Sequence, residues 1–270
     1  MELKDGLLFN QMSEYYDQFR PGYPNAIVET ILKRVHLNNG ANVLEIGSGS
    51  GKATAQLVGH DFELVCVEPG KDLAARCRDR FKDHKVSVIV SRFEDCRLPA
   101  GTFDAIVSAQ AFHWVEKPKG LEQCAKLLKS GGFLMPFWNI EILYDTELDR
   151  ELLEIMTQYD AFTATLPYAD YEKRVIRLSA ELAQNGWFAP PELVQVKWEK
   201  TYTAEEYFGF VMTGNEFIKN TDQKKQAGYD ALKALSKKHN GIHRKYICEL
   251  YIARKSDAVP AMPTLPCQED

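Results

Sequence analysis

The feature that most constrains this chain is a run of three alternating glycines placed directly after a short apolar segment. Residues 43–46 read Val-Leu-Glu-Ile, and Gly47, Gly49 and Gly51 follow. The apolar run is typical of a buried strand in a parallel sheet. The glycines let the backbone turn sharply and approach a ligand closely. The stretch therefore predicts a ligand-binding turn at the carboxyl edge of an open α/β sheet.

The charge and spacing of this turn argue against a bound dinucleotide. A pyrophosphate favours helix N-terminal amides with no carboxylate nearby, whereas Glu45 precedes the first glycine by two residues and suits a cationic amine or sulfonium. A dinucleotide fingerprint would also need a glycine at position 52, where this chain has Lys52. The turn therefore favours S-adenosylmethionine, and a plain strand-to-helix turn is the alternative for the glycines alone.

A second apolar run, at residues 64–67, ends in Glu68-Pro69 about one β-α unit further along the chain. An acid at this distance accepts hydrogen bonds from ribose hydroxyls in nucleoside-binding α/β folds. The alternative is that Glu68 caps the helix expected to begin near Gly70. Both roles are compatible, and the first motif favours the ribose role.

These motifs and their order resemble the class I S-adenosylmethionine-dependent methyltransferases. The resemblance spans about residues 9–256 and implies a doubly wound, seven-stranded, mostly parallel Rossmann-like sheet with a helical lid. Within that superfamily, two segments are similar to the small-molecule branch that includes trans-aconitate methyltransferase-like proteins. The supporting segments are 92–95 (RFED), 98–99 (LP) and 103–107 (FDAIV) for the superfamily, and 16–24 (YDQFRPGYP) and 111–115 (AFHWV) for the branch.

The resemblance also implies which residues form the site. Glu68 would hold the ribose, and Phe93-Glu94 would flank the adenine. The expected cofactor-binding residues are Tyr16, Arg20, Glu45, Gly47, Ser48, Gly49, Glu68, Pro69, Phe93, Glu94, Ala109 and Gln110. The expected substrate pocket is formed by Tyr23, His113, Trp114, Trp138 and Thr213.

His113 is the candidate for catalysis, either as a base or as a contact to the acceptor. It follows the fourth expected strand, and an unperturbed histidine has a pKa of about 6.5, which suits proton transfer at neutral pH. A base matters only where the methyl acceptor carries a proton, so a carboxylate needs none and a hydroxyl does. The alternative is that His113 and Trp114 pack against the lid or the cofactor without moving a proton.

Composition narrows the class of protein further. The 270 residues are 45% hydrophobic and 26% charged, as expected for one sizeable globular α/β domain. The net charge of −5 gives no general attraction to nucleic acid. No two of the six cysteines have CxxC spacing, so we expect no metal. Cys66 and Cys248 lie in expected buried strands, which suits free thiols in a reducing compartment. No stretch approaches the ~20 apolar residues of a membrane span, and we expect a cytoplasmic protein.

Alternating helical and strand patterns predict a single domain at residues 1–255. The resemblance implies that it comprises an N-terminal cap (1–36), a cofactor core (37–139), and a helical lid with edge strands (140–255). The tail at 256–270 has three prolines and no periodicity, and we expect it to be disordered. The expected strands lie at 43–46, 64–67, 86–90, 103–108, 132–138, 193–202 and 244–253. The expected helices lie at 25–36, 53–58, 71–81, 119–128, within 145–188, and at 203–212 and 215–238.

The sequence thus predicts methyl transfer to a small-molecule acceptor, at the oxygen of a carboxylate or a hydroxyl, by a monomer or a homodimer. A nucleic-acid or protein methyltransferase is an alternative. The acidic charge and residues 109–112 (AQAF), in place of Asn-Pro-Pro-Tyr, argue against methylation of base amino groups. A protein that binds the cofactor for a non-methylating reaction is another alternative. Lys52 disfavours a nicotinamide-dependent reductase.

Overall fold

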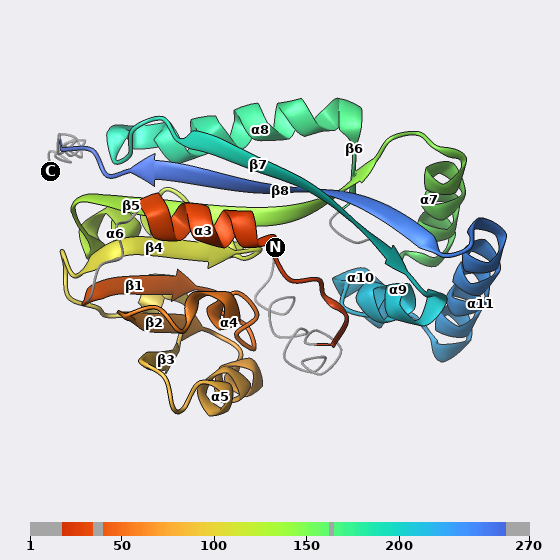
Figure 1. The fold of residues 1–270 in the computed structure, drawn as a ribbon, viewed down its shortest axis with the longest axis horizontal. Coiled ribbons are helices and arrows are strands. Elements are labelled where there is room, and N and C mark those ends of the chain that lie inside the picture. Colours follow the sequence, from red (N-terminus) through yellow and green to blue (C-terminus); the bar gives the residue numbers. More distant parts are fainter. Residues whose placement is uncertain (1–17, 35–39, 162–164, 258–270) are drawn as a thin grey trace, which may run out of the picture.

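A single twisted sheet organises the computed structural model, which describes residues 18–34, 40–161 and 165–257 (Figure 1). The strand order is β3-β2-β1-β4-β5-β8-β7, and β6 pairs with β5. Strands β1 to β6 pair in parallel, whereas β8 runs antiparallel to both β5 and β7. This order confirms the predicted doubly wound, mostly parallel sheet. The bounds are β1 Ala41–Ile46, β2 Phe62–Glu68, β3 Val86–Val90, β4 Phe103–Ala109, β5 Leu128–Leu143, β6 Thr165–Pro167, β7 Glu192–Tyr202 and β8 Ile242–Arg254.

Helices cover both faces of the sheet because successive strand residues point to opposite sides. In β1, Val43 belongs to one apolar cluster and Leu44 to the other, and both are fully buried. The Val43 cluster includes side chains of α3 and α5, and the Leu44 cluster includes side chains of α6 and α8. The bounds are α3 Asn25–Arg34, α4 Thr54–Leu57, α5 Lys71–Arg80, α6 Lys119–Leu127 and α8 Tyr168–Ala183.

Three strands extend past the core and carry a separate group of helices (Figure 1). Helices α7, α9 and α11 pack around the far ends of β5, β7 and β8, where Leu152, Phe210 and Leu232 share a third apolar cluster. Thr146 and Thr203 begin α7 and α9 with capping boxes, so the predicted helix start at Thr203 matches the structure. The bounds are α7 Glu147–Tyr159, α9 Ala204–Val211, α10 Asn215–Ile218 and α11 Asp222–His239.

The largest departure from the sequence prediction is the length of β5. The expected strand ended at Trp138, whereas β5 continues to Leu143 and pairs with both β8 and β6. Asn139 and Glu141 interrupt the apolar pattern but are only 3% and 1% exposed. Asn139 donates to the Gly22 carbonyl oxygen and Glu141 accepts from the Tyr207 hydroxyl, so both can be buried. The expected helical region 145–188 is likewise divided into α7 and α8 by the short strand β6.

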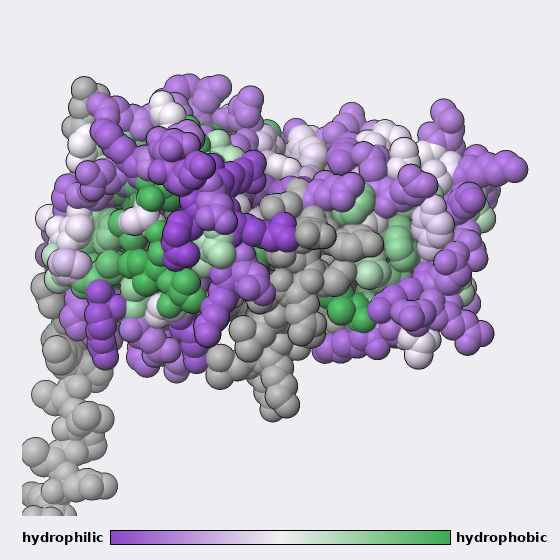
Figure 2. All heavy atoms as spheres, turned by 90° about the horizontal axis from the view of Figure 1, so that it is seen from below, coloured by the Kyte–Doolittle hydropathy of each residue, from purple (hydrophilic) through white to green (hydrophobic). Residues whose placement is uncertain are grey.

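The surface seen from below is mostly polar, and a patch of apolar residues lies at the end that carries edge strand β3 (Figure 2). In the parts of the chain that the structure describes, no helix is long and apolar enough to cross a membrane. The N-terminal 17 residues and residues 258–270, which include Tyr16 and nearly all of the expected tail, lie outside the described residues.

The glycine turn after β1 provides a test of the fold. Gly51 has a φ of 89°, and a Cβ added there would lie 2.4 Å from Cε2 of Phe81. We expect Gly51→Ala to lower the free energy of unfolding by about 3 kcal/mol, through backbone strain and overpacking. Gly59 has a similar φ of 94° but open space around it, so Gly59→Ala should cost only about 1–2 kcal/mol. Equal losses in denaturant titrations would contradict the packing argument.

Candidate functional site

The candidate site lies where the carboxyl ends of β1, β2 and β4 face helices α9 and α10 (Figure 1). The chain leaves β1 through Gly47, whose N–H donates to Val67 O at 2.8 Å. The φ of Gly47 is 70°, and a Cβ there would lie 2.4 Å from Cβ of Ala111. Glycine is therefore required for the turns after β1 and β4 to meet.

Glu68, the last residue of β2, ties the glycine turn to the start of α5. Its Oε2 accepts the Gly49 N–H at 2.9 Å, and its Oε1 accepts the Gly70 N–H at 2.8 Å. Burial raises the pKa of Glu68, and the two backbone donors oppose that shift. Each carboxylate oxygen can accept more than one hydrogen bond, so Glu68 can still receive hydroxyl donors. Contact with the α5 start and the predicted ribose role are thus compatible.

Glu45 lies beneath the same turn and is only 1% exposed. Its Oε2 accepts from Thr54 Oγ1 at 2.6 Å, but within the described residues its Oε1 has no hydrogen-bond partner. Burial raises the pKa of Glu45 to about 7, partly offset by hydrogen bonds from Thr54 and Cys66. The buried Ser48 Oγ also lacks a partner in this part of the structure. Unsatisfied buried polar atoms at a glycine turn fit a polar ligand with a cationic amine.

The residues predicted to flank the adenine follow β3 in the short 3₁₀ turn Phe93–Asp95. Phe93 is 4% exposed, and its carbonyl oxygen accepts from Gln123 Nε2 at 2.7 Å. Glu94 Oε1 accepts the backbone N–H of Glu116 at 2.8 Å, which joins the loops after β3 and β4. Pro69, at the end of β2, is exposed.

Gln110 has a strained backbone at the end of β4. Its φ is 57°, a left-handed conformation that is uncommon outside glycine. Its N–H donates to Phe137 O, and its Nε2 donates to Asn139 O, both at 2.9 Å. Strain of this kind clusters at functional sites. The preceding residue, Ala109, closes β4 and is buried.

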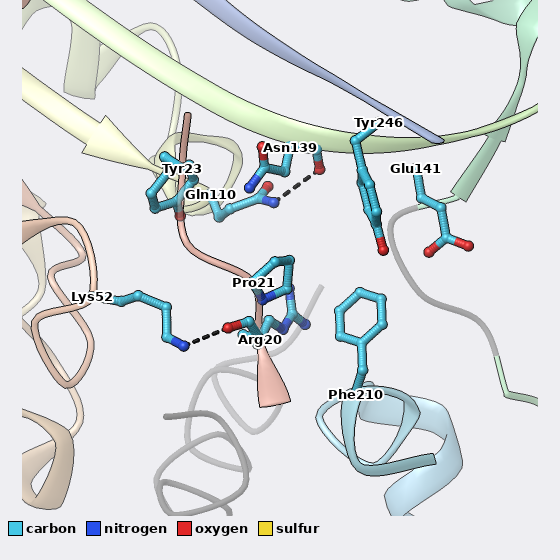
Figure 3. Close-up of a pocket in the computed structure, with 9 residues that line it drawn as sticks. All are labelled: Arg20, Pro21, Tyr23, Lys52, Gln110, Asn139, Glu141, Phe210 and Tyr246. Atoms are coloured by element: carbon cyan, nitrogen blue, oxygen red, sulfur yellow. Dashed lines mark hydrogen bonds between the residues drawn. The ribbon is translucent and has the colours of Figure 1, made fainter. Parts of the chain in front are cut away.

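A pocket open to solvent, with about 370 Å³ of empty space, lies beside this turn (Figure 3). At its outer end, Arg20 donates from Nε to Thr213 Oγ1 at 2.8 Å and from Nη2 to Thr213 O at 3.4 Å. Lys52 Nζ donates to the carbonyl oxygen of Arg20. The pocket is lined by Arg20, Pro21, Tyr23, Lys52, Gln110, Asn139, Glu141, Phe210 and Tyr246.

At the other end of the pocket, Glu141 belongs to a buried ionic cluster. Its Oε1 accepts from Arg244 Nε at 2.5 Å and from Tyr207 OH at 2.8 Å. Arg244 also donates from Nη1 to Asp149 Oδ1 at 2.6 Å. Arg244 and Glu141 are each 1% exposed, and Asp149 is 6% exposed. This cluster joins β5, β8, α7 and α9 behind the pocket.

His113 lies outside this pocket, in a short 3₁₀ turn after β4. Its Nδ1 is 3.3 Å from Trp138 Nε1, and since tryptophan only donates, the neutral histidine carries its proton on Nε2. Desolvation, followed by the charges of Arg174, Lys117 and Arg20, lowers its pKa to about 4. Desolvation and the neighbouring cationic groups both disfavour a positive charge on the ring, so it is neutral at pH 7.

The structure brings only some of the predicted site residues together. Arg20, Tyr23 and Gln110 line the pocket. Thr213 does not line it but accepts a hydrogen bond from Arg20. His113, Trp114 and Trp138 do not line it; Trp138 packs against Tyr251 on the opposite face of β5 from Asn139. Sequence reasoning missed Pro21, Lys52, Asn139, Glu141, Phe210 and Tyr246 as pocket residues. The alternation of Asn139 and Glu141 along a longer strand was a signal that could have identified two of them.

Known proteins resemble this chain in sequence and in fold. A family model described as "Methyltransferase domain" matches residues 44–135. An uncharacterised methyltransferase of Mycobacterium tuberculosis is 25% identical over 203 residues, covering 73% of this chain and 77% of the relative. A protein of Dictyostelium discoideum named as a methyltransferase is 29% identical over 219 residues, covering 78% and 81%.

Among solved structures, a protein from Anaeromyxobacter dehalogenans named as a type II methyltransferase superposes with a TM-score of 0.60. It is 19% identical, and the match covers 87% of this chain and 98% of that one. The sheet order and the glycine turn define a doubly wound α/β fold. The domain match, the related sequences and the shared fold together support the class I S-adenosylmethionine-dependent methyltransferase superfamily.

The pKa of Glu45 makes stability depend on pH. Between about pH 4.5 and 7 the folded protein keeps a proton on Glu45 that the unfolded chain has released, so this group lowers stability as pH rises. We expect the stability of Glu45→Gln, relative to the unmodified protein, to rise by about 3 kcal/mol between pH 4.5 and 8. Denaturant titrations across that range provide the measurement. Glu63→Gln, on an exposed position of β2, is the control, and a pH-independent difference for Glu45→Gln would contradict the prediction.

Proposed function

We propose that the protein transfers a methyl group from S-adenosylmethionine to an oxygen atom of a small molecule bound in the pocket. The observation that carries this proposal is the position of Glu68. Its carboxylate is held at the end of β2 by Gly49 and Gly70, beside a glycine turn that borders the pocket residue Lys52. S-adenosylmethionine is the cofactor of the superfamily, and it supplies an electrophilic methyl group on a positively charged sulfur.

The described residues suit distinct parts of that cofactor. Glu68 would accept hydrogen bonds from the ribose hydroxyls, and Phe93 and Glu94 would border the adenine. Glu45, buried beneath the glycine turn, would organise the amine of the methionine part, together with Gly47, Ser48 and the backbone of Ala109. At the outer end of the pocket, the guanidinium of Arg20 would pair with the methionine carboxylate.

The pocket supports a small acceptor in preference to a macromolecule. It is a hollow lined by side chains from several elements, including Tyr23, Gln110 and Phe210, and not an extended charged surface. The net charge of −5 does not favour a nucleic acid. The acceptor atom in this proposal is the oxygen of a carboxylate or a hydroxyl. Methyl transfer then needs alignment of donor and acceptor and exclusion of water.

For His113, which lies outside the pocket, we propose packing against the lid, and not proton abstraction. The bond from Trp138 leaves the proton on Nε2, so the side that is not bonded to Trp138 donates. A histidine with a pKa of about 4 is also a weak base at neutral pH.

We further propose that residues 1–255 act as one domain, in which residues 1–36 form a cap and residues 140–255 form the lid and edge strands. Five described cysteines are buried free thiols, which supports a reducing, cytoplasmic location. The assembly state in this proposal is a monomer or a homodimer.

Cofactor binding is the direct test of the proposed function. Calorimetry should show micromolar binding of S-adenosylmethionine and S-adenosylhomocysteine, and no binding of NAD or NADP. Glu68→Gln should weaken both by about tenfold or more, because the amide loses a charged acceptor for the ribose hydroxyls. Glu192→Gln, on the distant edge strand, is the matched control. Binding of a dinucleotide without the sulfonium pair would overturn the proposal.

Once an acceptor screen for S-adenosylhomocysteine release has given a substrate, the role of His113 can be tested by pH. If His113 acts as a neutral contact, kcat/KM should show no histidine limb near pH 6.5, and any acid limb from His113 should fall near pH 4. His113→Asn, which keeps a donor, should retain activity within about tenfold. A loss of about 10²-fold or more with unchanged cofactor affinity would restore the base hypothesis.

A further inference from the structure

We infer that Tyr246 donates a hydrogen bond from its hydroxyl group to an oxygen atom of the small molecule that binds in the pocket. The inference rests on the proposed function and adds to it a binding residue and a chemical class of ligand. Tyr246 lies on β8 and lines the pocket together with Phe210 and Glu141. In Figure 3 its ring extends along the pocket, and its hydroxyl oxygen is directed toward the side where Phe210 and Glu141 lie.

The Tyr246 hydroxyl is paired with the hydroxyl of a second tyrosine. The two oxygens of Tyr246 and Tyr202, the last residue of β7, are 2.8 Å apart, and by distance alone either could be the donor. A phenol hydroxyl has one proton to donate and can also accept a hydrogen bond through its oxygen. One of the two protons therefore lies between the oxygens, and the other is directed elsewhere.

Burial decides which of the two protons lies between the oxygens. Tyr202 is 0% exposed and does not line the pocket, and among the described residues its hydroxyl is hydrogen-bonded only to Tyr246. If Tyr246 were the donor, the Tyr202 proton would be buried without an acceptor, which is costly. Tyr202 therefore donates to Tyr246, and the proton of Tyr246 is left for a group in the pocket.

The remaining proton stays on Tyr246 at neutral pH. Burial, followed by the charge of Glu141, raises the pKa of Tyr246 well above its ordinary value. The Glu141 carboxylate accepts from Arg244 and Tyr207, and within the described residues Tyr246 donates no hydrogen bond to it. The Tyr246 hydroxyl is thus a neutral donor at the pocket wall, and a carbonyl, ether or hydroxyl oxygen of a ligand is its natural acceptor.

Both tyrosine rings are held in place by aromatic packing. Trp198 stacks on Tyr246 with a centroid distance of 4.4 Å. Tyr202 packs edge-on against Tyr207 and stacks with Phe210, at centroid distances of 5.5 and 6.1 Å. A donor that is fixed by such packing loses little conformational entropy when a ligand binds. The position of the hydroxyl therefore selects where the ligand must carry its oxygen.

The test compares two probes of nearly equal shape. 4′-Fluoroacetophenone carries a carbonyl oxygen, and 4-fluoro-α-methylstyrene has a methylene group in its place. Both are titrated by ligand-observed fluorine NMR, with and without saturating S-adenosylhomocysteine. In Tyr246→Phe we expect the ratio of ketone to alkene affinity to fall by about fivefold, because this variant lacks only the hydroxyl donor. An unchanged ratio in Tyr246→Phe, or no binding of the ketone to the unmodified protein, would overturn the inference.

Tyr202→Phe is the matched control, because it removes the other hydroxyl of the pair and leaves the Tyr246 proton free to donate. Its ratio of affinities should stay within about twofold of that of the unmodified protein. A rise in the ratio would mean that Tyr246 had donated to Tyr202. A fall as large as that in Tyr246→Phe would mean that the pair supports the pocket without donating to the ligand. Either result contradicts the inference.

If Tyr246→Phe does not fold because the buried Tyr202 hydroxyl loses its acceptor, the double variant Tyr202→Phe/Tyr246→Phe takes its place. Removing both members of a hydrogen bond costs less than removing one, and the ratio should again fall by about fivefold. A ratio equal to that of Tyr202→Phe would count against a donor at Tyr246. If S-adenosylhomocysteine itself does not bind, the proposed function is wrong, and the titrations without it still measure whether Tyr246 donates.

Discussion

The pairing of β5 with β8 is the interaction on which the rest of the site depends. Their register runs from Phe133 opposite Arg254 to Ile142 opposite Lys245, so one ladder spans the parallel core and the outer helices. At the core end, β5 also pairs with β4 and places Asn139 beside the turn after β4. At the far end, β5 carries Glu141, to which α9 and β8 attach. The pocket exists because one continuous strand connects these two halves.

The parts of the fold that the sequence predicted depend on local patterns. Alternating glycines, strand-length apolar runs and a threonine cap are properties of a few neighbouring residues, and they located the glycine turn, the strands and the start of α9. The full length of β5 could not be predicted, because Asn139 and Glu141 are polar residues with distant partners. Trp198 Nε1 donates to Asn139 Oδ1 at 3.1 Å, and Arg244 pairs with Glu141. Such partners, 59 and 103 positions away, leave no signal in the local pattern.

The same strand explains why the predicted substrate residues separate into two groups. Trp138 and Asn139 are neighbours in sequence, but a strand directs them to opposite faces of the sheet. His113 contacts Trp138 on the face of the sheet that α8 covers. Tyr23 and Gln110 lie on the other side, where they line the pocket together with Asn139. The resemblance predicted which residues form the site, but the pleat of β5 determines on which face of the sheet they lie. The roles of these residues in binding and catalysis stay predictions.

The segment from Arg20 to Tyr23 contributes to the pocket wall and also contacts the glycine turn through Lys52 and the adjacent α4 through Gln56. A ligand that fixes this segment from the cofactor side therefore fixes part of the wall that the acceptor meets. By linkage, the two ligands would then change each other's affinity by the same factor. The contacts of Lys52 and Gln56 with this segment thus couple the two proposed sites, whichever ligand binds first.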